Sequence, residues 1–288
     1  MDGKEKLIEK YCPVIDTIST EEALFNGWIS KYNEYEVIID VPDIEVYKTY
    51  NKEFTKHYEY FEYDFGLAMS MVGPKGYLNR IKFRDYKCPK GSKSEKSEVL
   101  KDVTYHAMEF MRTIQKRKAF INNHPKKLEI VNKIIEARKD KKIITFSNNV
   151  KMAEGIGYGE VYTGKITKKK GRTTIEEFNE KKTGVLNTCK KADEGLDVKG
   201  LSVAIVLGLD SSKIKATQRR GRAIRFEPDK TAEIFNIVIN KTVELNWFAE
   251  SHKDEKYIQV DEKNLEKILK NEDFESYKKP VLQFSFRY

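Results

Sequence analysis

Five short apolar runs, separated by helical patterns, lie between residues 124 and 239, and this alternation constrains the fold more than any other feature. The runs are at 143–146, 160–162, 185–186, 203–207 and 234–239. Buried parallel strands read as continuous apolar runs, and the crossovers between them are usually helices. The sequence therefore predicts an α/β fold in which a mostly parallel sheet carries helices on both faces.

Helix-start signals stand between these runs. Pro125 suits the first turn of a helix, and apolar residues follow at helical spacing from Leu128 onward. Thr174 and Glu177 have the spacing of a capping box, which predicts that a helix carrying Phe178 begins there. Both signals support the alternation of strands and helices.

The first part of the chain has a different pattern. Ser19 and Glu22 form a capping box for a short helix, and a β-rich run at 35–41 ends at Pro42. Residues 43–118 are predicted to be mostly helical, and they are rich in aromatic side chains, which are more typical of a core than of a base-stacking surface. Within them, the polar segment 90–97 is expected to be an exposed loop.

Composition narrows the class of protein. The 288 residues carry a net charge of +9, which favours a polyanionic partner, although a lysine-rich proteome would have the same effect. No apolar run approaches the roughly 18 residues of a membrane span, and no secretory signal is visible. The three cysteines are isolated and the four histidines lack metal-ligand spacing, so we expect a cytoplasmic protein with no metal centre of its own.

The segment Gln218-Arg-Arg-Gly-Arg222-Ala-Ile-Arg225 contains a candidate anion site. If the segment is helical, Arg222 and Arg225 share one face, with Gln218 one turn earlier. Two guanidinium groups on one face repel each other unless an anion lies between them, and a triphosphate meets that need. The alternative is a solvated basic helix face, which is how most arginine clusters are explained.

The ordered series of these segments resembles the second RecA-like domain of superfamily-two helicases. The segments at 144–148, 162–164, 184–197 and 218–225 follow the order of that family's motifs IV, IVa, V and VI. Residues 11–16 and 21–23 look like the segment that joins the two motor domains in phage and repair-type DNA helicases. The resemblance implies a RecA-like fold with an inserted helical subdomain. It also implies a phage origin, in which case the chain would act in the cytoplasm of the host.

The resemblance also implies roles for single residues. Arg225 would be the arginine finger on the γ-phosphate of ATP, with Arg222 beside it and Gln218 helping to position the pair. Gly195 and Asp197 would border the nucleotide. The residues implied to contact the nucleic-acid backbone are Thr188, Ser147 and Thr163. Arg219 and Arg220 are expected to face solvent or nucleic acid and are left out of the catalytic set.

A complete motor would also need a phosphate loop and an acidic box that binds magnesium. The stretch 159–166 nearly matches a phosphate loop, but Ile166 replaces the metal-binding hydroxyl and a strand is predicted to run through Val161 and Tyr162. The acidic pair at 193–194 does not resemble the box. We therefore expect that ATP and Mg²⁺ are shared with a separate chain carrying the first RecA-like domain, that DNA (or RNA) is the other partner, and that this chain is inactive alone.

The expected division has four parts: an interdomain segment and first strand at 1–42, the helical insertion at 43–118, the RecA-like domain at 119–245 and an extension at 246–288. The extension would hold a helix at 261–269 and a terminal strand at 281–286 that is either a sheet edge or a docking peptide. Two other functions stay open at this point. One is a nucleic-acid-binding module without ATP turnover, and the other is a regulatory subunit that docks on a complete helicase.

Overall fold

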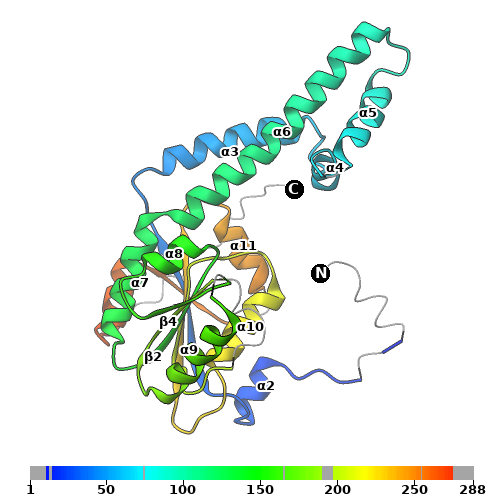
Figure 1. Cartoon of the computed structure of the whole chain (residues 1–288). Helices are drawn as coiled ribbons and strands as arrows, with labels where there is room; N and C mark the ends of the chain where they lie inside the picture. The colour runs from blue at the N-terminus through cyan, green and yellow to red at the C-terminus, as the bar shows by residue number, and fades with distance from the viewer. Residues whose placement is uncertain are drawn as a thin grey trace. The chain divides into compact units, whose positions relative to one another are not determined.

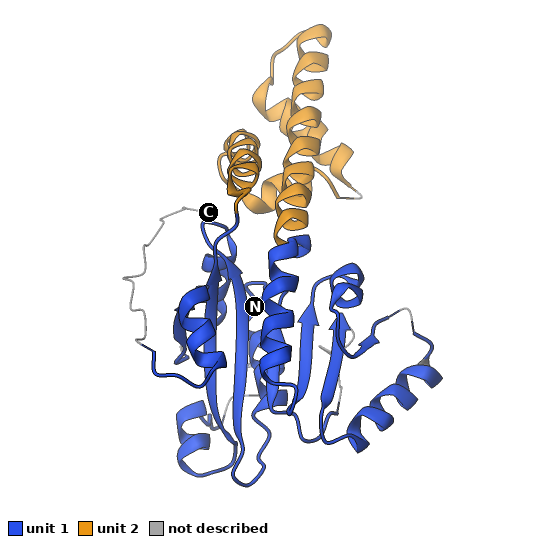
Figure 2. Cartoon of the chain, turned by 90° about the vertical axis from the view of Figure 1, so that its left-hand side faces the viewer, with its two compact units in different colours: residues 1–41, 122–278 blue, residues 42–121, 279–288 orange. Residues whose placement is uncertain are grey.

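The computed structural model describes residues 11–12, 15–73, 75–164, 166–189, 197–253 and 255–274. The chain divides into two compact units, coloured separately in Figure 2. Unit 1 comprises residues 1–41 and 122–278, and unit 2 comprises residues 42–121 and 279–288. Each unit is described by itself below.

Unit 1 contains a seven-stranded sheet in the order β3-β4-β2-β5-β6-β1-β7, and all its pairings are parallel. The strands are β1 (Lys31–Ile39), β2 (Lys142–Ser147), β3 (Glu160–Tyr162), β4 (Gly184–Cys189), β5 (Val203–Val206), β6 (Thr231–Ile239) and β7 (Ile258–Asp261). The predicted parallel sheet is confirmed, and each of the five apolar runs lies on one of its strands. The sequence did not predict β7, the short strand beside β1.

One face of this sheet is covered by three helices, α9 (Lys168–Glu180), α10 (Lys213–Ala223) and α11 (Glu244–Ser251), which are labelled in Figure 1. A single apolar cluster contains one residue from each of them, namely Phe178, Ala223 and Phe248. The same cluster contains alternate strand residues such as Ile144, Phe146, Ala204 and Val206. Alternation along a strand sends every second side chain to the same face, so these residues form one layer with the helices.

The other strand residues, such as Ile143 and Ile205, are equally buried and point to the opposite face. Helix α7 (Pro125–Ala137) begins at Pro125 as predicted and is apolar along one side. Its fully or almost fully buried apolar residues are Ile130, Val131, Ile134 and Ile135. The described part of unit 1 contains three further helices: α2 (Thr20–Phe25), α8 (Val150–Gly155) and α12 (Glu262–Leu269).

Unit 2 is helical and has its own aromatic core. Its helices are α3 (Ile44–Glu59), α4 (Phe65–Ser70), α5 (Gly76–Lys87) and α6 (Lys93–Asn123), the last of which ends two residues into unit 1. Tyr58, Phe61, Phe83 and Phe110 are buried together in one cluster. The prediction that aromatic residues of this block form a core is therefore confirmed. In the described part of the chain, no helix is both long and apolar enough to cross a membrane.

Two predictions of where a helix begins are wrong. Residues 93–97 are helical rather than part of a loop, because the Ser92 N–H donates to the Glu95 carboxylate and the Glu95 N–H to the Ser92 hydroxyl. This is the reciprocal pattern of a capping box, and its spacing was visible in the sequence. Helix α9 begins at Lys168 behind the cap residue Thr167, so Thr174 lies inside it and its hydroxyl donates to a carbonyl one turn earlier.

The other capping signals are confirmed. The Ser19 side chain accepts a hydrogen bond from the Glu22 N–H at the start of α2. The predicted helix at 261–269 is α12, and Asp261 caps it. The predicted terminal strand at 281–286 lies outside the described residues.

Candidate functional site

Helix α10 carries most of the candidate arginine segment. It ends at Ala223, so Gln218 and Arg222 lie one turn apart on the helix while Arg225 lies beyond its end. The expectation that Arg222 and Arg225 share one helical face is therefore not met. Arg225 instead forms an antiparallel bridge with Ile29, in the segment that leads into β1.

Ser30 holds the backbone around Arg225. The Ser30 N–H donates to the Ile224 carbonyl at 2.9 Å, and the Ser30 hydroxyl donates to the Arg225 carbonyl at 2.9 Å. The same hydroxyl accepts a hydrogen bond from the Glu227 N–H at 3.0 Å. Because Ser30 is buried, these bonds are shielded from water, and they fix the position from which the Arg225 side chain projects.

The Arg225 guanidinium forms an ion pair with the carboxylate of Asp197. The pair lowers the pKa of Asp197, first through the hydrogen bond and then through the charge of Arg225, and the charges of Lys199 and Arg222 act in the same direction. Both predicted arginines thus act on one carboxylate, although Arg222 is buried and Arg225 is exposed. The structure therefore pairs Arg225 directly with Asp197, and the charge of Arg222 acts on the same carboxylate.

The backbone around Asp197 is held from helix α9. The Asn179 side chain donates to the Asp197 carbonyl at 3.0 Å and accepts from the Lys199 N–H at 3.0 Å. Asp197 precedes β5 and Arg225 precedes β6, so this pair lies toward the ends where those strands begin.

Arg219 and Arg220 do not face solvent or nucleic acid as expected, because both are buried against the sheet. Arg220 forms ion pairs with Glu34 on β1 at 3.2 Å and with Glu255 at 2.8 Å. Arg219 donates to the Gly208 carbonyl at 2.7 Å and lies over the ring of Phe146. The two side chains therefore fasten α10 to the rest of unit 1.

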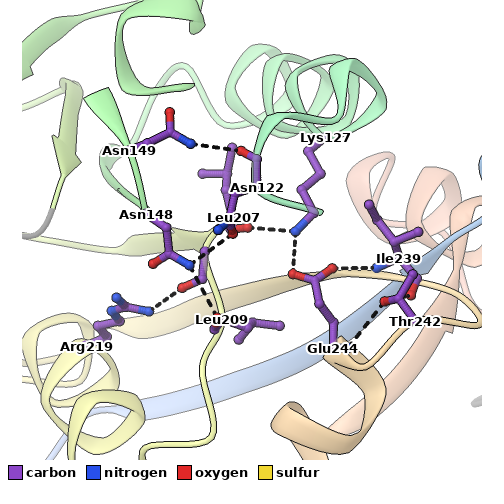
Figure 3. A network of polar contacts seen from close by, with 11 residues as sticks. Asn122, Lys127, Asn148, Asn149, Leu207, Leu209, Arg219, Ile239, Thr242 and Glu244 are labelled. Atoms are coloured by element: carbon purple, nitrogen blue, oxygen red, sulfur yellow. Dashed lines mark hydrogen bonds and ion pairs between the residues drawn. The ribbon is translucent and has the colours of Figure 1, made fainter. Parts of the chain in front are cut away.

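The loop after β5 is bound at three consecutive carbonyls by side chains from three different segments (Figure 3). Lys127 of α7 donates to Leu207 at 2.8 Å, Arg219 to Gly208, and Asn148 to Leu209 at 3.3 Å. A side chain at position 208 would place its Cβ 2.4 Å from the Asn148 side chain and 2.6 Å from its backbone nitrogen. Glycine is therefore required at position 208, where the loop passes close to Asn148.

A buried ion pair lies beside this loop. The Lys127 ammonium is 2.6 Å from the Glu244 carboxylate, and both side chains are completely buried. The second carboxylate oxygen of Glu244 accepts the Ile239 N–H at 3.0 Å, at the end of β6 (Figure 3). Burial lowers the pKa of Lys127 and raises the pKa of Glu244, while the charge of each partner opposes these shifts.

Ser147, Thr163 and Thr188 lie together at the carboxyl edge of the sheet. Thr188 pairs in register with Phe146, which precedes Ser147, and with Tyr162, which precedes Thr163. All three side chains are buried, and the Thr188 and Ser147 hydroxyls donate to the Thr145 and Thr188 carbonyls, respectively. The structure therefore places these residues at one edge without exposing their side chains.

Gly195 and the acidic pair at 193–194 lie outside the described residues. The predicted strand through Val161 and Tyr162 is confirmed, because β3 (Glu160–Tyr162) runs inside the stretch that nearly matches a phosphate loop. Within the described ranges, no group of three or more His, Cys, Asp or Glu residues could hold a metal ion.

Several residues that position the site were not predicted from the sequence. The burial of Arg219 and Arg220 could have been predicted from their spacing. Ala216 and Ala223 stand seven residues apart on α10, which is two helical turns, and such spacing marks the face of a helix that packs against the core. Arg219 and Arg220 lie on the turn between them and therefore on the same face. Ser30 had no such signal, because it acts on a carbonyl 195 positions away.

The parallel sheet, its two helical faces and helix α10 define a RecA-like domain. Residues 126–227 match the family of the helicase conserved C-terminal domain. Residues 126–227 are therefore similar to the C-terminal RecA-like domain of helicases.

A relative with a curated name supports the assignment. The chain is 31% identical over 125 residues to the "DNA 3'-5' translocase XPB2" of Sulfurisphaera tokodaii, a match that covers 42% of this chain and 28% of the relative. The chain thus spans little more than a quarter of that protein's length.

Two solved structures resemble the fold. The C-terminal part of the Fun30 ATPase domain gives a TM-score of 0.49 at 13% identity and covers 77% of this chain and 90% of that one. The C-terminal domain of the DEAD-box protein Dbp5 gives a TM-score of 0.46 at 18% identity, with 52% and 91% covered.

Proposed function

We propose that this chain supplies the C-terminal half of an ATP-dependent DNA helicase or translocase. In this proposal Arg225 is the arginine finger, Arg222 lies beside it and Gln218 helps to position the pair. The observation that carries the proposal is the site at Asp197, where the charges of two arginines act on one exposed carboxylate.

An exposed ion pair in water is weak, so Asp197 would release Arg225 readily to a more highly charged anion. A triphosphate is such an anion, and its charge spreads over the γ-phosphoryl oxygens during transfer. Ser30 would hold the Arg225 backbone in place while the guanidinium changes partner. Asp197, once released, would be available to border the nucleotide, with Gly195 nearby in sequence.

The proposal requires a second chain. The sequence of this chain has no phosphate loop and no acidic box, so a separate chain with the first RecA-like domain would hold ATP and Mg²⁺. When bound, ATP would supply the phosphoryl chemistry, and the residues of this chain would stabilise charge on it. Alone, the chain would be inactive.

DNA is the proposed nucleic-acid partner, and the name of the curated relative supports this choice. The proposed track runs along the carboxyl edge of the sheet at Ser147, Thr163 and Thr188. Because the Ser147 and Thr188 hydroxyls already donate to carbonyl groups, main-chain N–H groups beyond these strand ends would make the phosphate contacts.

The experiment is to mix the purified chain with a candidate partner that carries a phosphate loop and an acidic box, and to measure ATP hydrolysis with and without DNA. We expect hydrolysis that needs both chains and is stimulated by DNA. Hydrolysis at the full rate by either chain alone would contradict the proposal. Salt-sensitive DNA binding without hydrolysis in any mixture would instead favour a non-enzymatic binding module.

A further inference from the structure

Unit 2 has an open groove between helices α5 and α6, with a volume of about 500 Å³. The α6 residues that line it stand at helical spacing, so they form one continuous stripe on that helix. The lining residues that matter to the argument are Tyr77 and Arg80 from α5, and Ser97, Lys101, Thr104 and Tyr105 from α6.

Two tyrosine rings in this groove are exposed, and neither belongs to the aromatic core. Tyr77 is 59% exposed and Tyr105 is 54% exposed. The Tyr105 ring meets the rings of His57 and His106 at interplanar angles of 74° and 85°. Such edge contacts hold the ring in one orientation, which makes Tyr105 a fixed platform for a planar group.

The groove is also positively charged. Arg80 is 91% buried, and its Nη1 donates to the Met71 carbonyl, but its Nε has no hydrogen-bond partner and no carboxylate lies within ion-pair distance among the described residues. Lys101 is exposed and likewise has no ion pair within the described part of the chain. Residues 75–101 contain nine lysines and arginines but only three acidic residues.

We propose that this groove binds single-stranded nucleic acid. Exposed aromatic faces beside a basic groove stack unpaired bases and attract the phosphate backbone, which is the combination that single-strand binding uses. Among the described residues, none forms a hydrogen bond with the Ser97 hydroxyl, which lies on the same stripe as Lys101 and would donate to a phosphate oxygen. In a duplex the faces of the bases are stacked on one another, and an acidic peptide has no bases. Neither ligand could therefore stack a base on the two tyrosines.

This binding is separate from ATP turnover, since none of the lining residues belongs to the arginine site. The proposal for the groove can therefore fail or succeed independently of the proposed motor function. Binding to the groove is measured without ATP and without a partner chain. A strand held here would keep unit 2 attached to nucleic acid through every state of the nucleotide.

The test is fluorescence anisotropy of a labelled oligothymidylate of about 12 nucleotides with the full chain. We expect Tyr77→Ala and Tyr105→Ala each to weaken binding by about 5- to 150-fold, whereas Tyr105→Phe keeps the affinity because the ring remains. Lys101→Ala should weaken binding and reduce the slope of log affinity against log salt by roughly 1. Wild-type affinity in the Tyr77→Ala/Tyr105→Ala double variant would overturn the proposal.

Two matched controls lie outside the groove. Tyr86 is 73% exposed and stands nine residues after Tyr77, two and a half turns along α5 and hence on its opposite side. Lys52 is an exposed lysine on α3. We expect Tyr86→Ala and Lys52→Ala to bind the oligonucleotide like the wild type.

Photocrosslinking locates the strand directly and distinguishes this site from unit 1. With an oligonucleotide containing 5-iododeoxyuridine, we expect crosslinked peptides to contain Tyr77 or Tyr105. Crosslinks confined to unit 1 would overturn the proposal, and so would equal competition by a duplex or by polyglutamate at matched charge. The same crosslinks with an oligouridylate would extend the ligand to RNA.

Discussion

The guanidinium of Arg219 lies 2.7 Å from the carbonyl oxygen of Gly208, and this bond joins helix α10 to the loop after β5. The neighbouring carbonyls of that loop are bound by Lys127 and Asn148, so the loop cannot shift without breaking bonds to three segments. Because α10 carries Gln218 and Arg222, the loop also fixes the position of the candidate site. Arg219 is thus a positioning residue rather than a surface arginine.

We expect Gly208→Ala to destabilise unit 1 by about 1–3 kcal/mol, because the added Cβ overlaps Asn148. The second substitution Asn148→Ala should not restore stability, since the backbone nitrogen at position 148 is itself 2.6 Å from the added Cβ. Urea unfolding measures both variants. Gly221→Ala is the matched control, because its Cβ meets open space within α10 and should stabilise the helix slightly. Full rescue by Asn148→Ala would show that only the side chain matters.

Because Lys127 and Glu244 form a buried ion pair, we expect the loss of unfolding free energy to be larger when only Lys127 is replaced than when both residues are replaced. Lys127→Met leaves the Glu244 carboxylate buried without its partner, which costs about 3–5 kcal/mol of unfolding free energy. Adding Glu244→Gln removes the uncompensated charge, so the double variant should be more stable than Lys127→Met alone. The exposed Lys133→Met serves as control and should change stability little. If the stability loss of the double variant equalled the sum of the losses of the two single variants, the coupling between Lys127 and Glu244 would be contradicted.

The buried carboxyl group of Glu36 should make the stability of the protein depend on pH. Burial raises the pKa of this carboxyl group to about 7 in the folded protein, against an ordinary value of 4.5, although Gln259 donates a hydrogen bond to it. The folded state therefore binds the proton more tightly than the unfolded state. The contribution of Glu36 to stability is fully present below pH 4.5 and is lost as the pH rises through about 7.

The measurement is urea unfolding of the wild type and of Glu36→Gln between pH 5 and pH 8. Gln cannot ionise, and its carbonyl oxygen can still accept the bond from Gln259, so the variant should lose less stability than the wild type over this range. The expected difference is on the order of 3 kcal/mol. Glu266→Gln, an exposed change on α12, should leave the wild-type pH dependence intact. Parallel curves for the wild type and Glu36→Gln would rule out this role of Glu36.

The architecture of unit 1 was predictable because most of its strands are apolar runs and helical patterns lie between several of them. A continuous apolar run indicates a strand that is buried on both faces of a sheet, and this can be seen without knowing which strand pairs with it. The helix starts at Ser19 and Pro125 were predictable for the same reason, since a cap is a contact within one turn. Strand β7 was missed because four residues with one fully buried position carry little pattern.

The candidate site was only partly predictable. Arg222, Arg225 and Asp197 were predicted from the resemblance, and the structure pairs Arg225 with Asp197, whose pKa the charge of Arg222 also lowers. Their support was not predictable, because Ser30 contacts Arg225 across 195 positions and no local pattern records such a contact. The surface assignment of Arg219 and Arg220 was wrong because charged residues are usually exposed, and buried carboxylate or carbonyl partners cannot be read from one helix.

The central claim is that Arg225 acts on ATP held by a partner chain, and the most direct measurement is the single-turnover rate of ATP hydrolysis by the assembled pair at saturating DNA. Arg225→Ala should lower this rate by about 10³-fold or more while changing ATP binding far less, because the guanidinium stabilises charge that develops during transfer. Lys263→Ala removes an exposed positive charge from α12 and should hydrolyse ATP like the wild type. Hydrolysis by the Arg225→Ala pair at the wild-type rate would contradict the claim.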